Sequence, residues 1–169
     1  MKTLLALFLL LPVQAYALIE IGDAVPEMCW TDLAEKQVCL SQHTEKVRVL
    51  VYNTGWCPDC QREFTQLAPR AKEFSEDAVV FISLSSQGWT RGAPADTKFL
   101  NEWQARYNIP FPVAASPADA GRKFFNAPYF IPRAVVIDKE QKLAFKQTEE
   151  LDSLTVDELF AEVRKALQQ

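Results

Sequence analysis

The WCPDC segment at residues 56–60 constrains the fold of this chain more than any other feature. It follows an apolar run with strand character, 47–52, and it opens a stretch with helical periodicity. Cys57 is therefore expected at the N-cap of a helix, with Pro58 at the first helical position, where its missing N–H costs nothing. Free backbone N–H groups and the helix dipole stabilise a thiolate at that end. The pattern predicts an exposed attacking thiol at Cys57 and a covered resolving thiol at Cys60.

Two cysteines at this spacing can also form half of a zinc site. A second close pair would complete that site, but Cys29 and Cys39 are separated by more than the four residues that zinc motifs allow, and His43 is the only histidine. The strand-then-helix context therefore favours a redox pair over a metal site. The sequence contains no metal, haem or nucleotide signature, so we expect no cofactor.

The N-terminus has the layout of a secretory signal peptide. Lys2 supplies positive charge, residues 4–13 form an apolar run, and Ala15-Tyr16-Ala17 is a small-x-small cleavage site. The alternative is a buried N-terminal helix; the run is too short to span a bilayer. We predict that residues 1–17 are removed and that 18–169 form a single domain without a stable membrane anchor. Cysteines in an exported chain indicate an oxidising compartment, most simply a bacterial periplasm.

The composition is that of a globular protein. Hydrophobic residues make up 49% of the chain and charged residues 24%, and the formal net charge is −4. This charge leaves no basic patch for nucleic acid or for anionic lipid.

The remaining two cysteines fall in a predicted β-hairpin. Residues 28–31 and 37–40 read as its strands, and folding the segment about Ala34 places Cys29 opposite Cys39, close enough to bridge. The pattern predicts a structural disulfide. A second redox pair that relays electrons to Cys57 is the alternative.

Strand and helix patterns alternate through the rest of the chain. The predicted strands are 78–85, 111–115, 133–138 and 143–147, and 88–95 reads as a loop. The predicted helices are 61–74 with a kink or break at Pro69, 97–107, one that begins at the cap Ser116 and ends near Asn126, and a last one after the capping box at 155–158. This order is typical of an α/β sandwich around a central sheet.

The chain resembles the TlpA/ResA-like branch of the thioredoxin superfamily. The segments that carry the resemblance are VRVLVYNTGWCPDC, YNIPFPV and FIPRAVVID, together with the signal peptide and the hairpin, and it covers about 21–169. It implies a thioredoxin-like sandwich, with a central mixed sheet flanked by helices and an N-terminal β-hairpin. It also implies a cis peptide bond at Ile131-Pro132, in a loop that packs against the redox pair. The alternative is an ordinary trans proline that opens a strand.

Several residues depart from the family pattern. Val51 stands where thioredoxins carry a buried acid that accepts the proton of the second cysteine, so the resolving step is expected to use water or Glu63. Arg133 stands where the family has threonine, and its guanidinium either favours the Cys57 thiolate or points to solvent. The charge of Asp59 opposes that thiolate.

These features predict a periplasmic thiol:disulfide oxidoreductase that exchanges disulfides with envelope proteins, with reduction favoured over oxidation. Trp56 and the Ile131-Pro132 loop are expected to shape a docking face for extended peptide. The resemblance implies a membrane thiol carrier as the reductant and protein thiols or disulfides as clients.

Two other classes of protein compete with this prediction. Thr54-Gly55-Trp56-Cys57 reproduces part of the peroxiredoxin motif, although Leu50 stands in place of its proline, so a thiol peroxidase is one alternative. The other is a redox-silent binding module on the same fold.

Overall fold

A computed structural model of the chain describes residues 18–126, 130–147 and 155–169. The predicted signal peptide, 1–17, lies outside the described residues, so its removal stays a prediction. None of the helices within the described ranges has the length and apolar character needed to cross a membrane.

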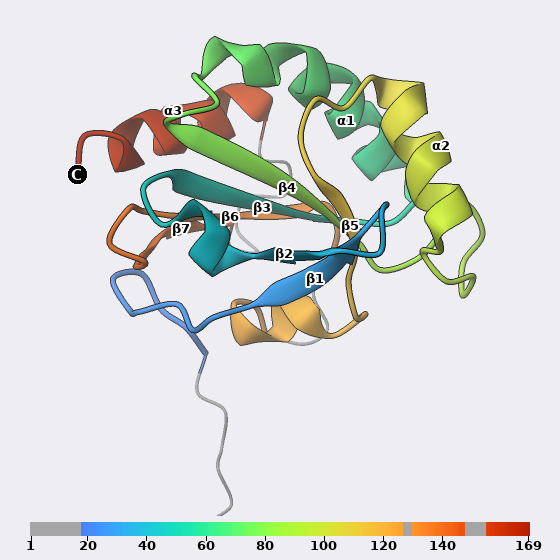
Figure 1. The fold of residues 1–169 in the computed structure, drawn as a ribbon, viewed down its shortest axis with the longest axis horizontal. Helices are drawn as coiled ribbons and strands as arrows, with labels where there is room; N and C mark the ends of the chain where they lie inside the picture. Colours follow the sequence, from blue (N-terminus) through green and yellow to red (C-terminus); the bar gives the residue numbers. More distant parts are fainter. Residues whose placement is uncertain (1–17, 127–129, 148–154) are drawn as a thin grey trace, which may run out of the picture.

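A seven-stranded mixed sheet runs through the centre of the molecule (Figure 1). Its strand order is β2-β1-β5-β4-β3-β6-β7. Strands β3, β4 and β5 are parallel neighbours, and every other neighbouring pair is antiparallel. The strands are β1 (Cys29–Asp32), β2 (Gln37–Cys39), β3 (Val47–Asn53), β4 (Val79–Ser85), β5 (Val113–Ala115), β6 (Arg133–Ile137) and β7 (Leu143–Lys146).

The three α-helices of the described residues lie together on one face of the sheet (Figure 1). They are α1 (Pro58–Arg70), α2 (Thr97–Tyr107) and α3 (Val156–Ala166). The other face is covered by the segment before β1 and by two short 3₁₀ turns, η1 (Leu40–His43) and η3 (Ala120–Lys123). This is the thioredoxin-like sandwich with an N-terminal hairpin that the sequence predicted.

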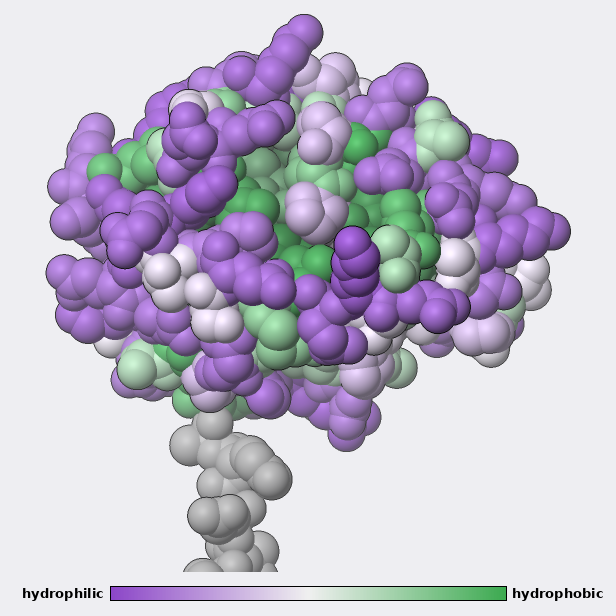
Figure 2. Space-filling view, in the orientation of Figure 1, coloured by the Kyte–Doolittle hydropathy of each residue, from purple (hydrophilic) through white to green (hydrophobic). Residues whose placement is uncertain are grey.

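Strand β3 is buried along its whole length because both faces of the sheet are covered. Val49 and Val51 join the cluster under the helices, whereas Leu50 and Tyr52 join the cluster on the other face. Apolar residues surface mainly in the middle of the view in Figure 2, and hydrophilic residues surround them. The sheet is therefore packed between two separate apolar layers. The CxxC segment follows the end of β3.

The hairpin has the predicted register. Cys29 pairs with Cys39 across β1 and β2, and the two sulfurs form a disulfide. The capping box before α3 is also present, because Thr155 and Glu158 each accept a hydrogen bond from the other's backbone N–H.

Two predicted helices differ from the structure. The helix expected from Ser116 to Asn126 is only the turn η3 within the described residues. Gly121 lowers the helical propensity there, and Phe124 and Phe125 both pack against Tyr52. The first helix does not break at Pro69: α1 continues to Arg70, and a 3₁₀ turn, η2 (Ala71–Glu73), follows.

Candidate active site

Cys57 occupies the N-cap of α1, and Pro58 begins the helix, as predicted. The Cys57 Sγ accepts a hydrogen bond from the backbone N–H of Cys60 at 3.3 Å. A sulfur atom at the N-cap faces the unpaired backbone N–H groups of the first helical turn, and these groups stabilise its thiolate form.

The two cysteines are free thiols with opposite electrostatic environments. The pKa of Cys57 is lowered to about 7, chiefly by a hydrogen bond from the Cys60 side chain and also by the backbone N–H groups of Cys60 and Asp59. Burial and the Asp59 charge raise the pKa of Cys57, but they do not outweigh these hydrogen bonds. Burial is the main cause that raises the pKa of Cys60, and its hydrogen bond to Cys57 adds to it. The pair therefore combines one thiol that ionises near neutrality with one that stays protonated.

The prediction of an exposed Cys57 is wrong. Its exposed fraction is 5%, and that of Cys60 is 0%. The Ile131–Pro132 bond is cis, as predicted, and the carbonyl oxygen of Ile131 lies 3.6 Å from the Cys57 Sγ, within reach of its S–H. This loop is 74 residues away in the chain, and its packing covers Cys57.

Glu63 is a buried acid on the same helix, one turn after Cys60. Its exposed fraction is 9%, and its Oε2 has no hydrogen-bond partner among the described residues. Burial, with the Cys57 charge as a smaller cause, raises the pKa of Glu63 to about 8. The Glu63 charge in turn contributes to the raised pKa of Cys60. The Glu63 carboxyl therefore interacts electrostatically with both cysteines. Val51, at the position of the buried acid of thioredoxins, is fully buried and has no ionisable group.

Both predicted orientations of Arg133 are wrong. The side chain is buried, and its guanidinium donates to the carbonyl oxygens of Phe130 and Gln147. Arg133 pairs with Tyr52 in the sheet, so the two side chains share a face, and Tyr52 packs in the layer remote from Cys57. Strand register, which the local sequence did not reveal, decides this placement.

A half-buried indole, Trp56, directly precedes the CxxC segment. Its Nε1 donates to the Gln87 Oε1 at 2.8 Å, and the guanidinium of Arg91 lies 4.1 Å from its ring centroid. From the sequence, 88–95 was predicted only as a loop, and both partners of Trp56 were missed. The glycines and the proline in this segment indicate a turn, but they do not show that the turn contacts Trp56.

Phe130, next to the cis-proline loop, was also missed. Its exposed fraction is 74%, the largest among the exposed large hydrophobic residues of the described chain. This exposed aromatic residue directly before Ile131 adds apolar surface next to the cis-proline loop.

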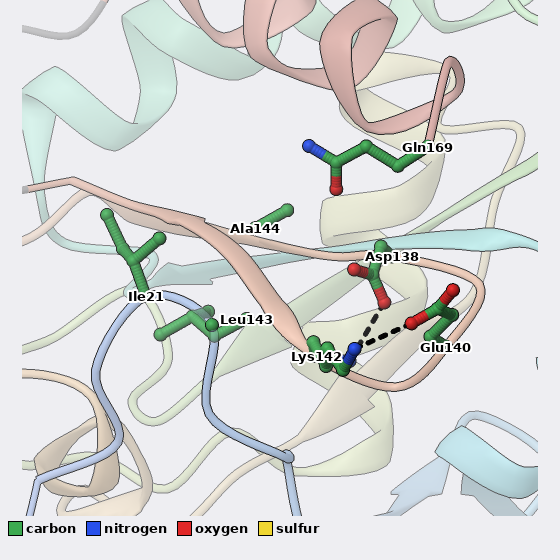
Figure 3. A pocket seen from close by; sticks show the side chains of 8 residues that line it. Ile21, Asp138, Glu140, Lys142, Leu143, Ala144 and Gln169 are labelled. Carbon is green, nitrogen blue, oxygen red and sulfur yellow. Dashed lines mark hydrogen bonds and ion pairs between the residues drawn. The ribbon is translucent and has the colours of Figure 1, made fainter.

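The molecule also has surface cavities that do not involve the CxxC segment. One of about 250 Å³ lies between the β6–β7 turn and the C-terminus, where Lys142 binds Glu140 (Figure 3). A second, of about 290 Å³, lies between the hairpin turn and the segment before β5. Neither has a thiol among its lining residues, so neither continues the redox site.

One group of potential metal ligands occurs within the described ranges, formed by Glu27, Cys29 and Cys39. The disulfide engages both of these sulfurs. Thiolates, not disulfide sulfurs, ligate metals, so the group does not fit a metal in this oxidation state.

A family model, that of the AhpC/TSA family, matches residues 21–146, which is most of the chain. The chain belongs to the AhpC/TSA family. No curated protein sequence matches it.

Solved structures with the same fold cover nearly the whole chain. A putative protein disulfide isomerase from Bacteroides thetaiotaomicron is 21% identical, with a TM-score of 0.68 over 89% of this chain and 92% of its own. A putative thiol:disulfide interchange protein DsbE from Chlorobium tepidum is 19% identical, with a TM-score of 0.70 over 88% and 99%. A secreted Mycobacterium tuberculosis disulfide oxidoreductase is 21% identical, with a TM-score of 0.64 over 82% and 95%. These structures share the fold of this chain, and each of the three is named for disulfide chemistry, which agrees with the resemblance predicted from the sequence.

Proposed function

We propose that this protein is a thiol:disulfide reductase of the bacterial cell envelope, with Cys57 and Cys60 as its redox pair. The observation that carries the proposal is the asymmetry of the two thiols. The pKa of Cys57 is lowered to about 7, whereas burial raises that of Cys60. A thiolate is the nucleophile in disulfide exchange, so Cys57 attacks and Cys60 resolves.

The reaction needs no cofactor. The Cys57 thiolate attacks one sulfur of a client disulfide, a mixed disulfide forms, and the other client sulfur leaves as a thiolate. Cys60 then loses its proton and attacks the Cys57 sulfur. The Cys57–Cys60 disulfide forms, and the second client sulfur leaves. The client gains two electrons, and the protein loses two.

We assign the role of accepting the Cys60 proton to Glu63 rather than to water, because Glu63 is a buried carboxyl one turn after Cys60 and Val51 has no ionisable group. Part of its raised pKa comes from the charge of the Cys57 thiolate. That charge disappears when Cys57 enters the mixed disulfide, so the pKa of Glu63 falls at the moment when Cys60 must be deprotonated. A carboxyl whose pKa lies near the working pH can both accept and return a proton.

The pKa of Cys57 supports reduction over oxidation. One well-characterised dithiol protein whose attacking cysteine has a pKa of about 7 has a potential of about −270 mV, whereas another with a pKa of about 3.5 has a potential of about −120 mV. A modestly stabilised thiolate leaves the reduced form less favoured, so the pair passes electrons on.

The location and partners in this proposal come from the sequence. A cleaved signal peptide at 1–17 would deliver residues 18–169 to the periplasm, where exported proteins with wrong or excess disulfides are the clients. A membrane thiol carrier would supply the electrons. Cys29–Cys39 would remain oxidised as a structural staple.

The family also admits peroxide reduction, so the test compares two substrates. The purified reduced protein is mixed with a protein disulfide substrate or with hydrogen peroxide, and loss of the Cys57 and Cys60 thiols is followed. We expect fast exchange with the disulfide and slow reaction with peroxide. The reverse order would assign the protein to the thiol peroxidases.

The roles of the two cysteines are tested by trapping. Cys60→Ser should accumulate mixed disulfides with client proteins, because nothing then resolves them, and Cys57→Ser should form none. Adducts in Cys57→Ser alone would reverse the roles. Full function of Cys57→Ser would instead favour a redox-silent binding module.

A further inference from the structure

The loop between β4 and α2, residues 86–96, packs directly on the turn that precedes Cys57. The Gly55 N–H donates to the Gln87 carbonyl oxygen at 3.0 Å. A Cβ on Gly55 would lie 2.4 Å from a Phe99 ring carbon and 2.8 Å from the Gly88 carbonyl carbon. The approach is so close that only glycine fits, and the loop is held against the CxxC turn.

The side chain of Gln87 fastens this loop to Trp56. Its Oε1 accepts hydrogen bonds from the Trp56 Nε1 at 2.8 Å and from the Gly92 N–H at 2.7 Å. Arg91, directly before Gly92, is thereby placed with its guanidinium 4.1 Å from the centroid of the Trp56 ring. Its position on the ring of Trp56, the residue directly before Cys57, is built into the fold.

The Arg91 guanidinium is exposed and forms no hydrogen bond or ion pair with the described residues. Its five N–H donors are therefore available. Asp59, the acidic residue closest in sequence to Cys57, is already paired with Arg62. The charge of Arg91 is not among the causes that shift the pKa of Cys57. The positive charge on the Trp56 ring is thus not paired with an acidic group of the described residues, nor is it among these causes.

We propose that Arg91 is a specificity-determining residue, which selects client segments that carry a carboxylate next to the reactive cysteine. This inference rests on the proposed function of Cys57. A planar guanidinium stacked on an indole is pre-organised for bidentate binding of a carboxylate. An extended acidic segment of a client would place its cysteine sulfur at Cys57 and its carboxylate on Arg91.

Arg91 takes no part in the bond changes of the exchange. Cys57 attacks the client sulfur, the new S–S bond forms, and the leaving sulfur departs as a thiolate. Arg91 holds the neighbouring carboxylate and thereby raises the rate of productive encounter for acidic clients.

The test uses two peptides that differ only in Asp or Asn beside a cysteine, each activated as a 2-pyridyl disulfide. The rate constant for release of 2-thiopyridone by the reduced full-length protein is measured for both, and their Asp-to-Asn ratio is the readout. The ratio cancels the intrinsic reactivity of each peptide when variants are compared. We expect it to fall about two- to fivefold in Arg91→Gln, the range of an exposed ion pair, and to fall similarly in wild type at high salt.

Arg106→Gln is the matched control, because the Arg106 guanidinium lies 4.1 Å from the ring centroid of Trp89 and so stacks on a different indole from Arg91. It should keep the wild-type ratio, and Arg91→Lys should give an intermediate one. An unchanged ratio in Arg91→Gln, with normal exchange by Cys57, would overturn this inference alone. A shifted pH midpoint for Cys57 alkylation in Arg91→Gln would also overturn it, since Arg91 would then tune the thiolate. Absence of exchange with either peptide in wild type would overturn the proposed function itself.

Discussion

At the scale of single residues, the site contains three ionisable groups whose surroundings shift their pKa values differently. Cys57 receives N–H groups at the helix start, Cys60 is enclosed by the core, and Glu63 is buried without a partner for its Oε2. The pKa of Cys57 is lowered to about 7, and that of Glu63 is raised to about 8. The two groups titrate close together, so the charge of one affects the proton of the other.

The Cys57 thiolate should govern the pH dependence of alkylation. We expect the rate of reaction of the reduced protein with iodoacetamide to rise with pH around a midpoint of about 7, because only the thiolate reacts. The Asp59 charge raises the pKa of Cys57, so Asp59→Asn should move the midpoint to lower pH. Asp77→Asn, on the turn before β4, is the control and should leave it in place. A midpoint near that of an ordinary thiol would contradict the N-cap account.

Glu63 should make stability depend on pH. Its folded pKa of about 8 lies above the ordinary value of 4.5, so its contribution to stability is fully present below about pH 4.5 and is lost as pH rises through about 8. Glu63→Gln removes this loss. The difference in free energy of unfolding, variant minus wild type, should therefore increase with pH by at most about 1.4 kcal/mol per unit. Urea unfolding of both reduced proteins across this range measures it, and a flat difference would refute the buried protonated carboxyl.

At the scale of secondary-structure elements, features set by local sequence were predicted correctly, whereas features set by long-range packing were not. The N-cap at Cys57, the capping box at Thr155 and the hairpin register of Cys29 with Cys39 were predictable, because each depends on residues close in sequence. The burial of Cys57 depends on a loop 74 residues away. The direction of Arg133 depends on which face of the sheet β6 presents. Neither can be read from a short window of sequence.

The hairpin disulfide is expected to stabilise the fold without taking part in exchange. It closes a loop with a sequence separation of 10, so the double variant Cys29→Ser/Cys39→Ser should lose about 2–3 kcal/mol of unfolding free energy. Urea denaturation measures this loss, and exchange with a protein disulfide should persist below the new transition. Loss of exchange in a still-folded double variant would favour the electron relay instead.

At the scale of the whole molecule, the sheet brings three separate segments to the end of β3. The CxxC turn with the start of α1, the Gln87 loop and the Ile131–Pro132 loop meet there. The sequence predicted the sandwich and the first and last of these, because motif spacing and family resemblance carry them. Gln87, Arg91 and Phe130 were missed, since their roles arise only when the loops are folded together. We therefore propose that one pair of thiols carries out the reduction and that the loops around it select the client.

The equilibrium reduction potential of the Cys57–Cys60 pair decides whether the protein reduces or oxidises its clients. The protein is equilibrated with buffers of reduced and oxidised glutathione or dithiothreitol, quenched with an alkylating agent, and the state of each cysteine is mapped by mass spectrometry. We expect a potential towards about −270 mV, with Cys29 and Cys39 unlabelled throughout the transition. A potential near about −120 mV would make the protein an oxidase, and labelling of Cys29 and Cys39 in place of Cys57 and Cys60 would contradict the assignment of the redox pair.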